Sequence, residues 1–261
     1  MSDMTSGSVP EDEGRASTEI APAAPAVPAP VQESQTPVSA DMVQAVTRID
    51  RSIKERRDSD TILMNYWLYF FLVSWVTFGI YALVLFFKRI TRIDGFSERK
   101  RSYYEALIDW TERYSQQQGK EDEVHHMLGD MRSEIQAAYN GNLRKINAGL
   151  SFLLTIVTLG IYGLYVLYRM NRYWWDAMVV EQEFDDKLSQ VWSKLGLMRY
   201  PVSFTLDQAK RRGYALYLIL SIVTFGIWGI VWDYKIHTDP DNLYKEFHSI
   251  EDTVLHTVRA H

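Results

Sequence analysis

Apolar residues concentrate in three uninterrupted runs, at positions 66–87, 148–168 and 214–232. The runs hold 22, 21 and 19 residues, and none of them contains Lys, Arg, Asp or Glu. About 20 apolar residues is the length that one α-helix needs to cross roughly 30 Å of hydrocarbon. The pattern therefore predicts an all-α membrane protein with three repeated apolar helical insertions.

The three runs repeat one motif when they are aligned on their central glycines. Each copy reads hydroxyl, apolar, Val, Thr, Phe or Leu, Gly, Ile, aromatic and small, and a cation follows nine positions after the glycine. Internal repeats define an architecture, so we expect these positions to be structural and the cations to lie at the membrane interface. The motif positions are Thr77, Gly79, Tyr81, Thr158, Gly160, Tyr162, Thr224, Gly226 and Trp228, and the interfacial cations are Lys88, Arg169 and Lys235.

The Thr-Phe/Leu-Gly segment lies near the middle of each run, and it leaves two architectures open. Glycine adopts conformations that other residues avoid, and a threonine hydroxyl can satisfy a backbone group where a helix stops. Each copy is then a helix-break-helix insertion with legs of about 12 to 15 Å that enters and leaves on one face. Alternatively, each copy is a single straight span that uses its glycine for close helix packing.

The flanking charges favour the first architecture. Three straight spans would divide the 22 Lys and Arg near the runs into 11 on each side. The positive-inside rule does not expect an even division. Insertions that return to one face place all of these cations on the cytoplasmic side, and we expect their three tips to pack together.

Amphipathic segments precede and follow the insertions. The basic segment 41–60 predicts a helix that lies on the membrane surface, or else a solvated helix that leads into the first run. Two stripes on either side of Gly119 predict an antiparallel helical hairpin, and Asp239 and Pro240 are expected to start the last helix. We interpret the stripes as intramolecular packing faces, with docking of another subunit as the alternative. The stripes are Val43, Val46, Ile49 and Ile53; Tyr103, Leu107, Trp110 and Tyr114; Val124, Leu128, Met131, Ile135 and Ala138; Ala177, Phe184, Leu188, Val191 and Leu195; and Leu243, Phe247, Ile250, Val254 and Val258.

The N-terminal segment differs in composition from the rest of the chain. It contains six of the eight prolines, and the residues up to Asp41 carry a net charge of −6. Such a segment cannot bury enough apolar surface to offset the entropy of ordering. In chain order, the predicted organisation is a disordered acidic Pro/Ala-rich tail (1–40), an amphipathic juxtamembrane helix (41–60), membrane repeat 1 (61–95), a helical hairpin (96–145), membrane repeat 2 (146–172), a helical connector (173–212), membrane repeat 3 (213–237) and a C-terminal amphipathic helix (238–261).

The motif resembles that of a bacterial membrane family called domain of unknown function 4234. The usual form in that family is close to Leu-Ser-Ile-Val-Thr-Phe-Gly-Ile-Tyr-Gly-Ile-Tyr-Trp followed by a basic residue. The third copy is the most similar and has Trp232 at the tryptophan position, where the other copies have Leu85 and Val166. The resemblance implies a bacterial membrane location and supplies no catalytic residues.

Candidate chemistry is sparse. The chain has no cysteine, which excludes disulfides and thiolate catalysis. It has no phosphate-binding or dinucleotide-binding glycine pattern and no zinc-helix motif. Asp233 is the single acid at the edge of an insertion. It relays protons, pairs with a cation from another copy, or simply marks the water boundary.

These observations lead to a functional expectation. We expect a protein of the bacterial inner membrane with a cytoplasmic N-terminus, no catalytic activity, no cofactor and no metal. It would organise the membrane or recruit a partner, and the alternative is a subunit of a pore or transporter. The expected partners are anionic phospholipids and either a second copy of the chain or a cytoplasmic protein, but not nucleic acid.

Overall fold

Each apolar run folds as two helical legs, because the chain turns at its Thr-Phe/Leu-Gly segment. The computed structural model describes residues 40–78, 80–197, 204–208 and 211–261. The predicted helical break within each run is confirmed, and the alternative of one straight helix per run is wrong. The legs of the first run are α3 (Tyr66–Leu68), a π-helical stretch (Tyr69–Val73) and α4 (Ser74–Val76), then α5 (Ile80–Gln117); those of the second are α7 (Ala148–Val157) and α8 (Ile161–Leu195); those of the third are α9 (Tyr214–Val223) and α10 (Ile227–Ala260).

The second leg of each run continues into the body of the protein without a break. Helices α5, α8 and α10 hold 38, 35 and 34 residues, so each is both an exit leg and a long bundle helix. The expected boundary between residues 95 and 96 therefore falls inside α5, and the one between 172 and 173 falls inside α8. The remaining helices are α1 (Ala40–Lys54), α2 (Arg56–Ser59) and α6 (Glu121–Asn140).

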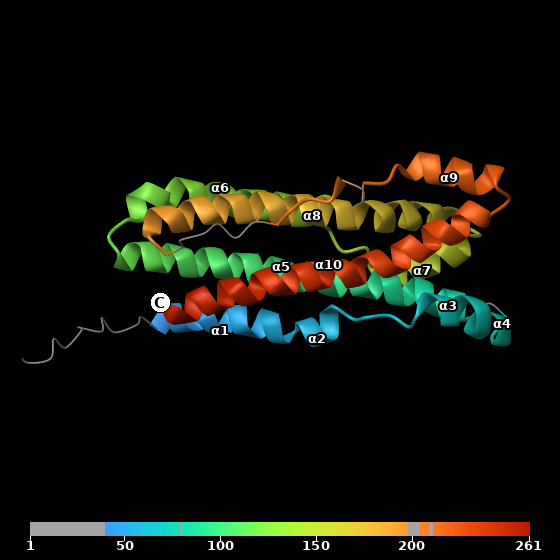
Figure 1. The fold of residues 1–261 in the computed structure, drawn as a ribbon, viewed down its shortest axis with the longest axis horizontal. Helices are drawn as coiled ribbons and strands as arrows, with labels where there is room; N and C mark the ends of the chain where they lie inside the picture. Colours follow the sequence, from blue (N-terminus) through green and yellow to red (C-terminus); the bar gives the residue numbers. More distant parts are fainter. Residues whose placement is uncertain (1–39, 79, 198–203, 209–210) are drawn as a thin grey trace, which may run out of the picture. The chain divides into compact units, whose positions relative to one another are not determined.

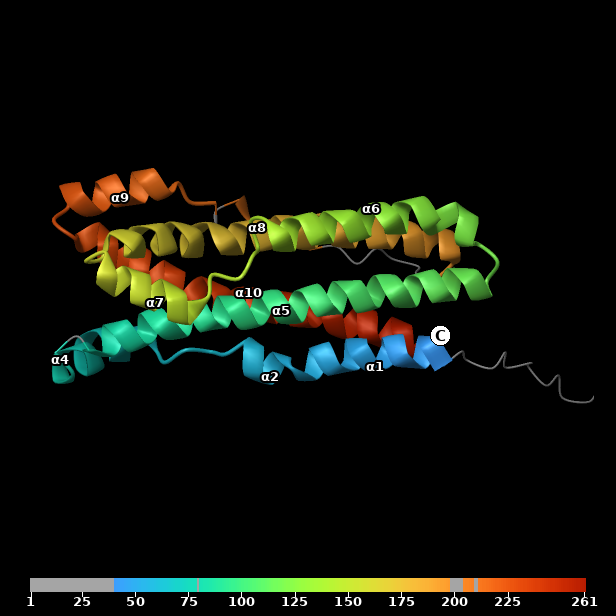
Figure 2. The same cartoon turned by 180° about the vertical axis from the view of Figure 1, so that it is seen from behind.

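The long helices lie side by side and share one hydrophobic core (Figure 1). Position six after the motif glycine is buried in every exit helix: Val166 and Trp232 lie in this core, and Leu85 lies in a smaller cluster with Tyr66 and Tyr69. Seen from either side, α4, α7 and α9 lie at the same end of the bundle, opposite α1 and the C-terminus (Figure 2). The three hairpins therefore project from one end.

The hairpin predicted after the first run is confirmed. Helix α5 ends at Gln117, Gly119 takes a φ of 64°, and α6 returns antiparallel along α5. The predicted stripes of α5, α6, α8 and α10 are buried or half-buried in the core. Intramolecular packing, rather than docking of another subunit, accounts for them.

The apolar face predicted for the first helix is confirmed except at Val43. Ile49 is buried, and Val46 and Ile53 are half-buried against the core, whereas Val43 is 53% exposed. The buried face also includes Met42 and Ala45, which the predicted stripe omitted. Helix α1 lies along α5, so it is neither the membrane-surface helix nor the solvated leader that the sequence left open.

Pro240 does not start the last helix. It lies inside α10, which has already run for thirteen residues when it reaches this proline. A proline inside a helix removes a backbone hydrogen bond from the preceding turn. The guanidinium of Arg92 donates to the carbonyl of His237 at 3.2 Å, and the side chain of Asp239, the expected cap, pairs with Arg212 instead.

Some expectations fall on residues that are not described. Residues 1–39 of the predicted tail and Gly79 lie outside the described residues. Within the part of the chain that the structure describes, no helix combines the length and the apolar character needed to cross a membrane.

Candidate functional site

The three motif copies form the same turn, and the threonine holds it together. The hydroxyl of Thr158 donates to the carbonyl of Leu154 at 2.7 Å and accepts from the backbone N–H of Tyr162 at 2.9 Å. Thr77 and Thr224 make the same pair of bonds at 2.7–3.2 Å. One hydroxyl thus satisfies a carbonyl at the end of the entry leg and an N–H at the start of the exit leg.

In the second and third copies, the two residues after the threonine bend the chain back through left-handed conformations. Leu159 and Gly160 have φ values of 50° and 93°, and Phe225 and Gly226 have values of 51° and 90°. A Cβ added at either glycine would meet nothing within 4 Å. These central glycines therefore serve backbone conformation, and the alternative that they serve close helix packing is wrong.

Close packing occurs instead at the small residue three positions further on. A Cβ at Gly163 would lie 3.1 Å from Cγ2 of Thr155, and one at Gly229 would lie 3.6 Å from the hydroxyl oxygen of Ser221. In the second and third copies, the hydroxyl residue that opens the motif and the glycine that closes it thus face each other across the two legs. This contact explains why both ends of the motif recur.

The tips of the hairpins are apolar and fully exposed. Phe78, Leu159 and Phe225 are 95%, 94% and 98% exposed, so the expectation that the tips pack together is wrong. Among the described residues, large hydrophobic side chains are exposed almost entirely within the three runs. The exceptions are Val43, Ile62, Met64 and Tyr234. One end of the bundle therefore presents a large apolar surface, which we call the apolar end.

The remaining motif residues have different surroundings. The aromatic residues Tyr81 and Trp228 contact rings of their own entry legs, Tyr69 and Tyr217, at centroid distances of 5.8 and 5.9 Å. Tyr162 instead contacts Tyr165 of its own helix, at 5.4 Å. These half-buried rings act as packing residues.

The three motif cations do not share a partner. Arg169 donates to the carbonyls of Arg144 and Asn142 at 2.7 and 3.4 Å. Lys88 is exposed and Lys235 is half-buried, and neither forms an ion pair with the described residues. All three follow the apolar legs, where the exposed apolar surface ends.

Asp233 pairs with a cation from another copy, as one of the three sequence interpretations predicted. Both carboxylate oxygens accept from the guanidinium of Arg89, which also lies 3.3 Å from Nδ1 of His237. Nε2 of His237 lies 2.7 Å from the carbonyl of Met64. Since arginine only donates, Nδ1 accepts and Nε2 carries the proton. Burial and the nearby Arg89 lower the pKa of His237 to about 4, so this cluster joins the first and third exit helices with a neutral imidazole.

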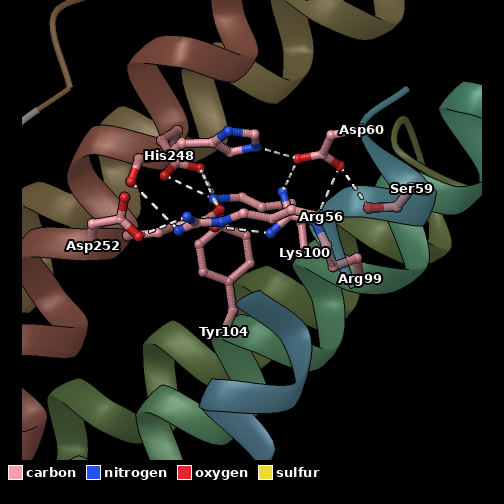
Figure 3. A network of polar contacts seen from close by, with 10 residues as sticks. Arg56, Ser59, Asp60, Arg99, Lys100, Tyr104, His248 and Asp252 are labelled. Atoms are coloured by element: carbon pink, nitrogen blue, oxygen red, sulfur yellow. Dashed lines mark hydrogen bonds and ion pairs between the residues drawn. The ribbon is translucent and has the colours of Figure 1, made fainter. Parts of the chain in front are cut away.

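A buried charge network lies further along the same helices (Figure 3). Nζ of Lys100 lies 2.6 Å from Glu181 and 2.9 Å from Glu251. The guanidinium of Arg99 binds Glu251 at 2.8 Å and Asp60 at 2.7 Å. These five side chains are 1% exposed or less.

The network is balanced in charge. Arg56 reaches Glu251 at 2.7 Å and adds a third cation to the three acids. Burial alone would raise the pKa of Glu251, but Lys100, Arg99 and Arg56 together hold it well below its usual range. For Lys100, the attraction of the two glutamates outweighs burial and raises the pKa of the amine. Glu251 and Lys100 thus both remain charged in the core.

The hydrophobic pattern of the chain does not by itself reveal this network, although it carries a signal for it. The signal is a charged residue where the helical period of a stripe calls for an apolar one. Such residues are Lys100, Glu181 and Glu251, each three or four positions from an apolar member of the stripe. A charged residue at such a position either does not face the core or is one member of a buried ion pair. Three such positions on three helices indicate a common partner.

The comparisons with known proteins add one match. Residues 212–255 match the family model described as domain of unknown function (DUF4234). The match covers α9, the third turn and most of α10, which is the copy whose motif resembles that family, and the first two copies lie outside it. No curated protein and no solved structure matches the chain.

The turn geometry predicts opposite effects for one substitution at two glycines. Gly160→Ala should lower the free energy of unfolding by about 1–2 kcal/mol, because an L side chain is strained at positive φ. Gly149→Ala, inside α7, should be neutral or stabilising by up to roughly 1 kcal/mol, since alanine favours helix. Thermal unfolding in detergent measures both. Equal melting of the two variants would contradict the conformational role of Gly160.

The buried carboxyl of Asp185 predicts a pH dependence. Burial and the nearby Glu181 raise its pKa to about 9, from an ordinary value of 3.8. The folded state therefore keeps a proton that the unfolded state loses, so stability falls as pH rises from about 4 to 9. Asp185→Asn should remove this dependence and stabilise the protein by at least about 1 kcal/mol at pH 7. Asp186→Asn, at an exposed neighbour, is the control; unfolding curves at pH 5 and 8 that match for wild type and Asp185→Asn would refute the assignment.

Proposed function

We propose that this protein inserts its apolar end into one leaflet of a membrane and holds the helical bundle outside as a scaffold for a partner. The observation that carries the proposal is the state of the three hairpin tips. Each tip places a Phe or Leu that is at least 94% exposed in a left-handed backbone conformation. Both properties are unfavourable in water, and they occur together three times.

The energetics support an apolar environment for the tips. A left-handed conformation costs an L residue roughly 1–2 kcal/mol, and Gly or Asn would adopt it more readily. Burial of a Phe or Leu side chain in an apolar phase contributes about 1.5–3 kcal/mol. Phe78, Leu159 and Phe225 therefore make the turns less stable in water than Gly or Asn would. The free energy of burying these side chains offsets that cost only when the tips enter an apolar phase.

The dimensions of the hairpins suit one leaflet. Helices α7 and α9 hold ten residues each, so they are about 15 Å long, or half of a 30 Å hydrocarbon core. In lipid, a helix break is tolerated only when its backbone groups are satisfied. The threonine of each turn bonds both legs, so the break carries its own partners into the apolar phase.

The charged residues fit the same orientation. Each motif cation lies nine positions after its glycine, and nine positions of an α-helix span about 14 Å. With the tips at mid-membrane, Lys88, Arg169 and Lys235 lie at the head-group level and attract anionic lipids. We place the bundle on the cytoplasmic side of a bacterial inner membrane, because flanking Lys and Arg favour that side.

Tip substitutions test the proposal, because stability and membrane binding should change in opposite directions. Asn tolerates the left-handed conformation, so Phe225→Asn should keep or raise the melting temperature while weakening flotation with phospholipid vesicles about tenfold. The triple variant Phe78→Asn, Leu159→Asn, Phe225→Asn should fail to float. Val43→Asn, at an exposed apolar residue of α1, should float like wild type. Flotation of the triple variant at the wild-type level would end the proposal.

Insertion from one side also predicts the accessibility of labels. The chain lacks cysteine, so single cysteines at Gln117, Ser189 and Ser249 report on three bundle helices without background. All three should be protected from an impermeant thiol reagent in intact spheroplasts and should react after lysis. A cysteine replacing Phe225 should stay unreactive in both states. Reaction of Gln117 in intact cells would contradict the one-sided arrangement.

A further inference from the structure

A groove of about 480 Å³ lies beside the first exit helix, where the apolar surface of α5 ends. This volume is within the range of small-molecule sites, roughly 300–1,000 Å³. Its lining changes along its length: one part is apolar, and the other carries charged and hydroxyl side chains. The apolar lining is Ile62, Leu63, Met64, Tyr81, Val84 and Phe87.

The groove also accounts for two side chains that the apolar runs leave unexplained. Ile62 is 73% exposed and Met64 is 37% exposed, and both are among the few large hydrophobic residues exposed outside the runs. The segment that carries them is fixed at its C-terminal end. Its Met64 carbonyl binds His237 at 2.7 Å, and the side chain of Asn65 accepts from the backbone N–H of Trp67 at 3.0 Å. The wall is therefore preformed.

Two opposite charges line the polar part of the groove without pairing to each other. Lys88 and Asp58 are exposed, and neither side chain forms an ion pair with the described residues. Arg92, the other cation of the lining, is buried and already bound to Asp241 at 2.8 Å. At the equivalent position of the second repeat, Arg169 is occupied by backbone carbonyls. Among the described residues, Lys88 and Asp58 thus remain without an ion-pair partner beside an apolar wall.

We propose that this groove binds one phospholipid whose head group carries a primary ammonium, of the phosphatidylethanolamine type. Lys88 pairs with the phosphate diester, Asp58 accepts from the ammonium, and an acyl chain lies along Val84, Phe87 and Ile62. An ammonium with N–H groups fits Asp58 better than a quaternary one does, and an anionic head group without a cation leaves Asp58 unpaired. This inference rests on the proposed membrane insertion, which brings the groove to the head-group level.

Native mass spectrometry of the full-length protein in mild detergent tests the proposal. The protein is incubated with phosphatidylethanolamine, phosphatidylglycerol or phosphatidylcholine, and the bound molecules are counted. Wild type should retain one phosphatidylethanolamine at least fivefold more than either other lipid. Lys88→Met should reduce retention of all three lipids. Asp58→Asn should abolish the preference for phosphatidylethanolamine.

Repeat-equivalent variants provide matched controls. Val84→Trp should fill the groove and lose the lipid, whereas Val231→Trp, five residues after the third motif glycine, should retain it. Likewise, Lys235→Met should retain the lipid that Lys88→Met loses. Equal retention by Val84→Trp and Val231→Trp, or a preference of wild type for phosphatidylglycerol, would overturn the inference. Vesicle flotation of wild type is measured in parallel: flotation without groove-dependent retention overturns the groove alone, and absence of flotation overturns the insertion as well.

Discussion

The structure depends on a turn whose threonine bonds backbone groups of both helical legs at the middle of an apolar run. A helix interrupted in an apolar phase would expose carbonyl and N–H groups at a cost of several kcal/mol each. The hydroxyl of Thr158 removes this cost by bonding Leu154 and Tyr162 at once. Because the turn is satisfied locally, each hairpin forms from its own legs and needs no partner at its tip, which leaves Phe225 and its equivalents exposed.

The buried charges complement the turns by fixing how the three exit helices stand relative to one another. Lys100 on α5 binds Glu181 on α8 and Glu251 on α10, so one ammonium group joins all three exit helices. Sliding one helix by a turn would leave a buried charge unpaired, at a cost of about 3–5 kcal/mol. Since each exit helix also carries a hairpin, this penalty keeps the three tips at the same end of the bundle. The ion pairs that fix the axial positions of the three exit helices therefore also align the three hairpins at the apolar end.

Much of the local structure could be predicted from the sequence. The repeated threonine and glycine indicated a break, and the stripes from Tyr103 to Tyr114 and from Val124 to Ile135 indicated a hairpin. These features depend on contacts within a few residues or on helical periodicity, and both can be read from the order of the residues. The alternative that Gly160 is a packing position stayed open in the sequence, because periodicity does not distinguish a glycine that admits a neighbour from one that adopts positive φ.

The remainder depended on contacts between residues far apart in the chain. Lys100 and Glu251 are separated by 151 positions, and each looks like a surface residue until the other is placed beside it. Part of the buried face of α1 was missed for the same reason, since Met42 and Ala45 are buried only because α5 lies against them. Likewise, the motif assigns one cation to equivalent positions of the repeats. It does not show that Arg169 binds backbone carbonyls while Lys88 forms no ion pair with the described residues. The repeats thus specify what the three hairpins share, and their long-range partners specify how they differ.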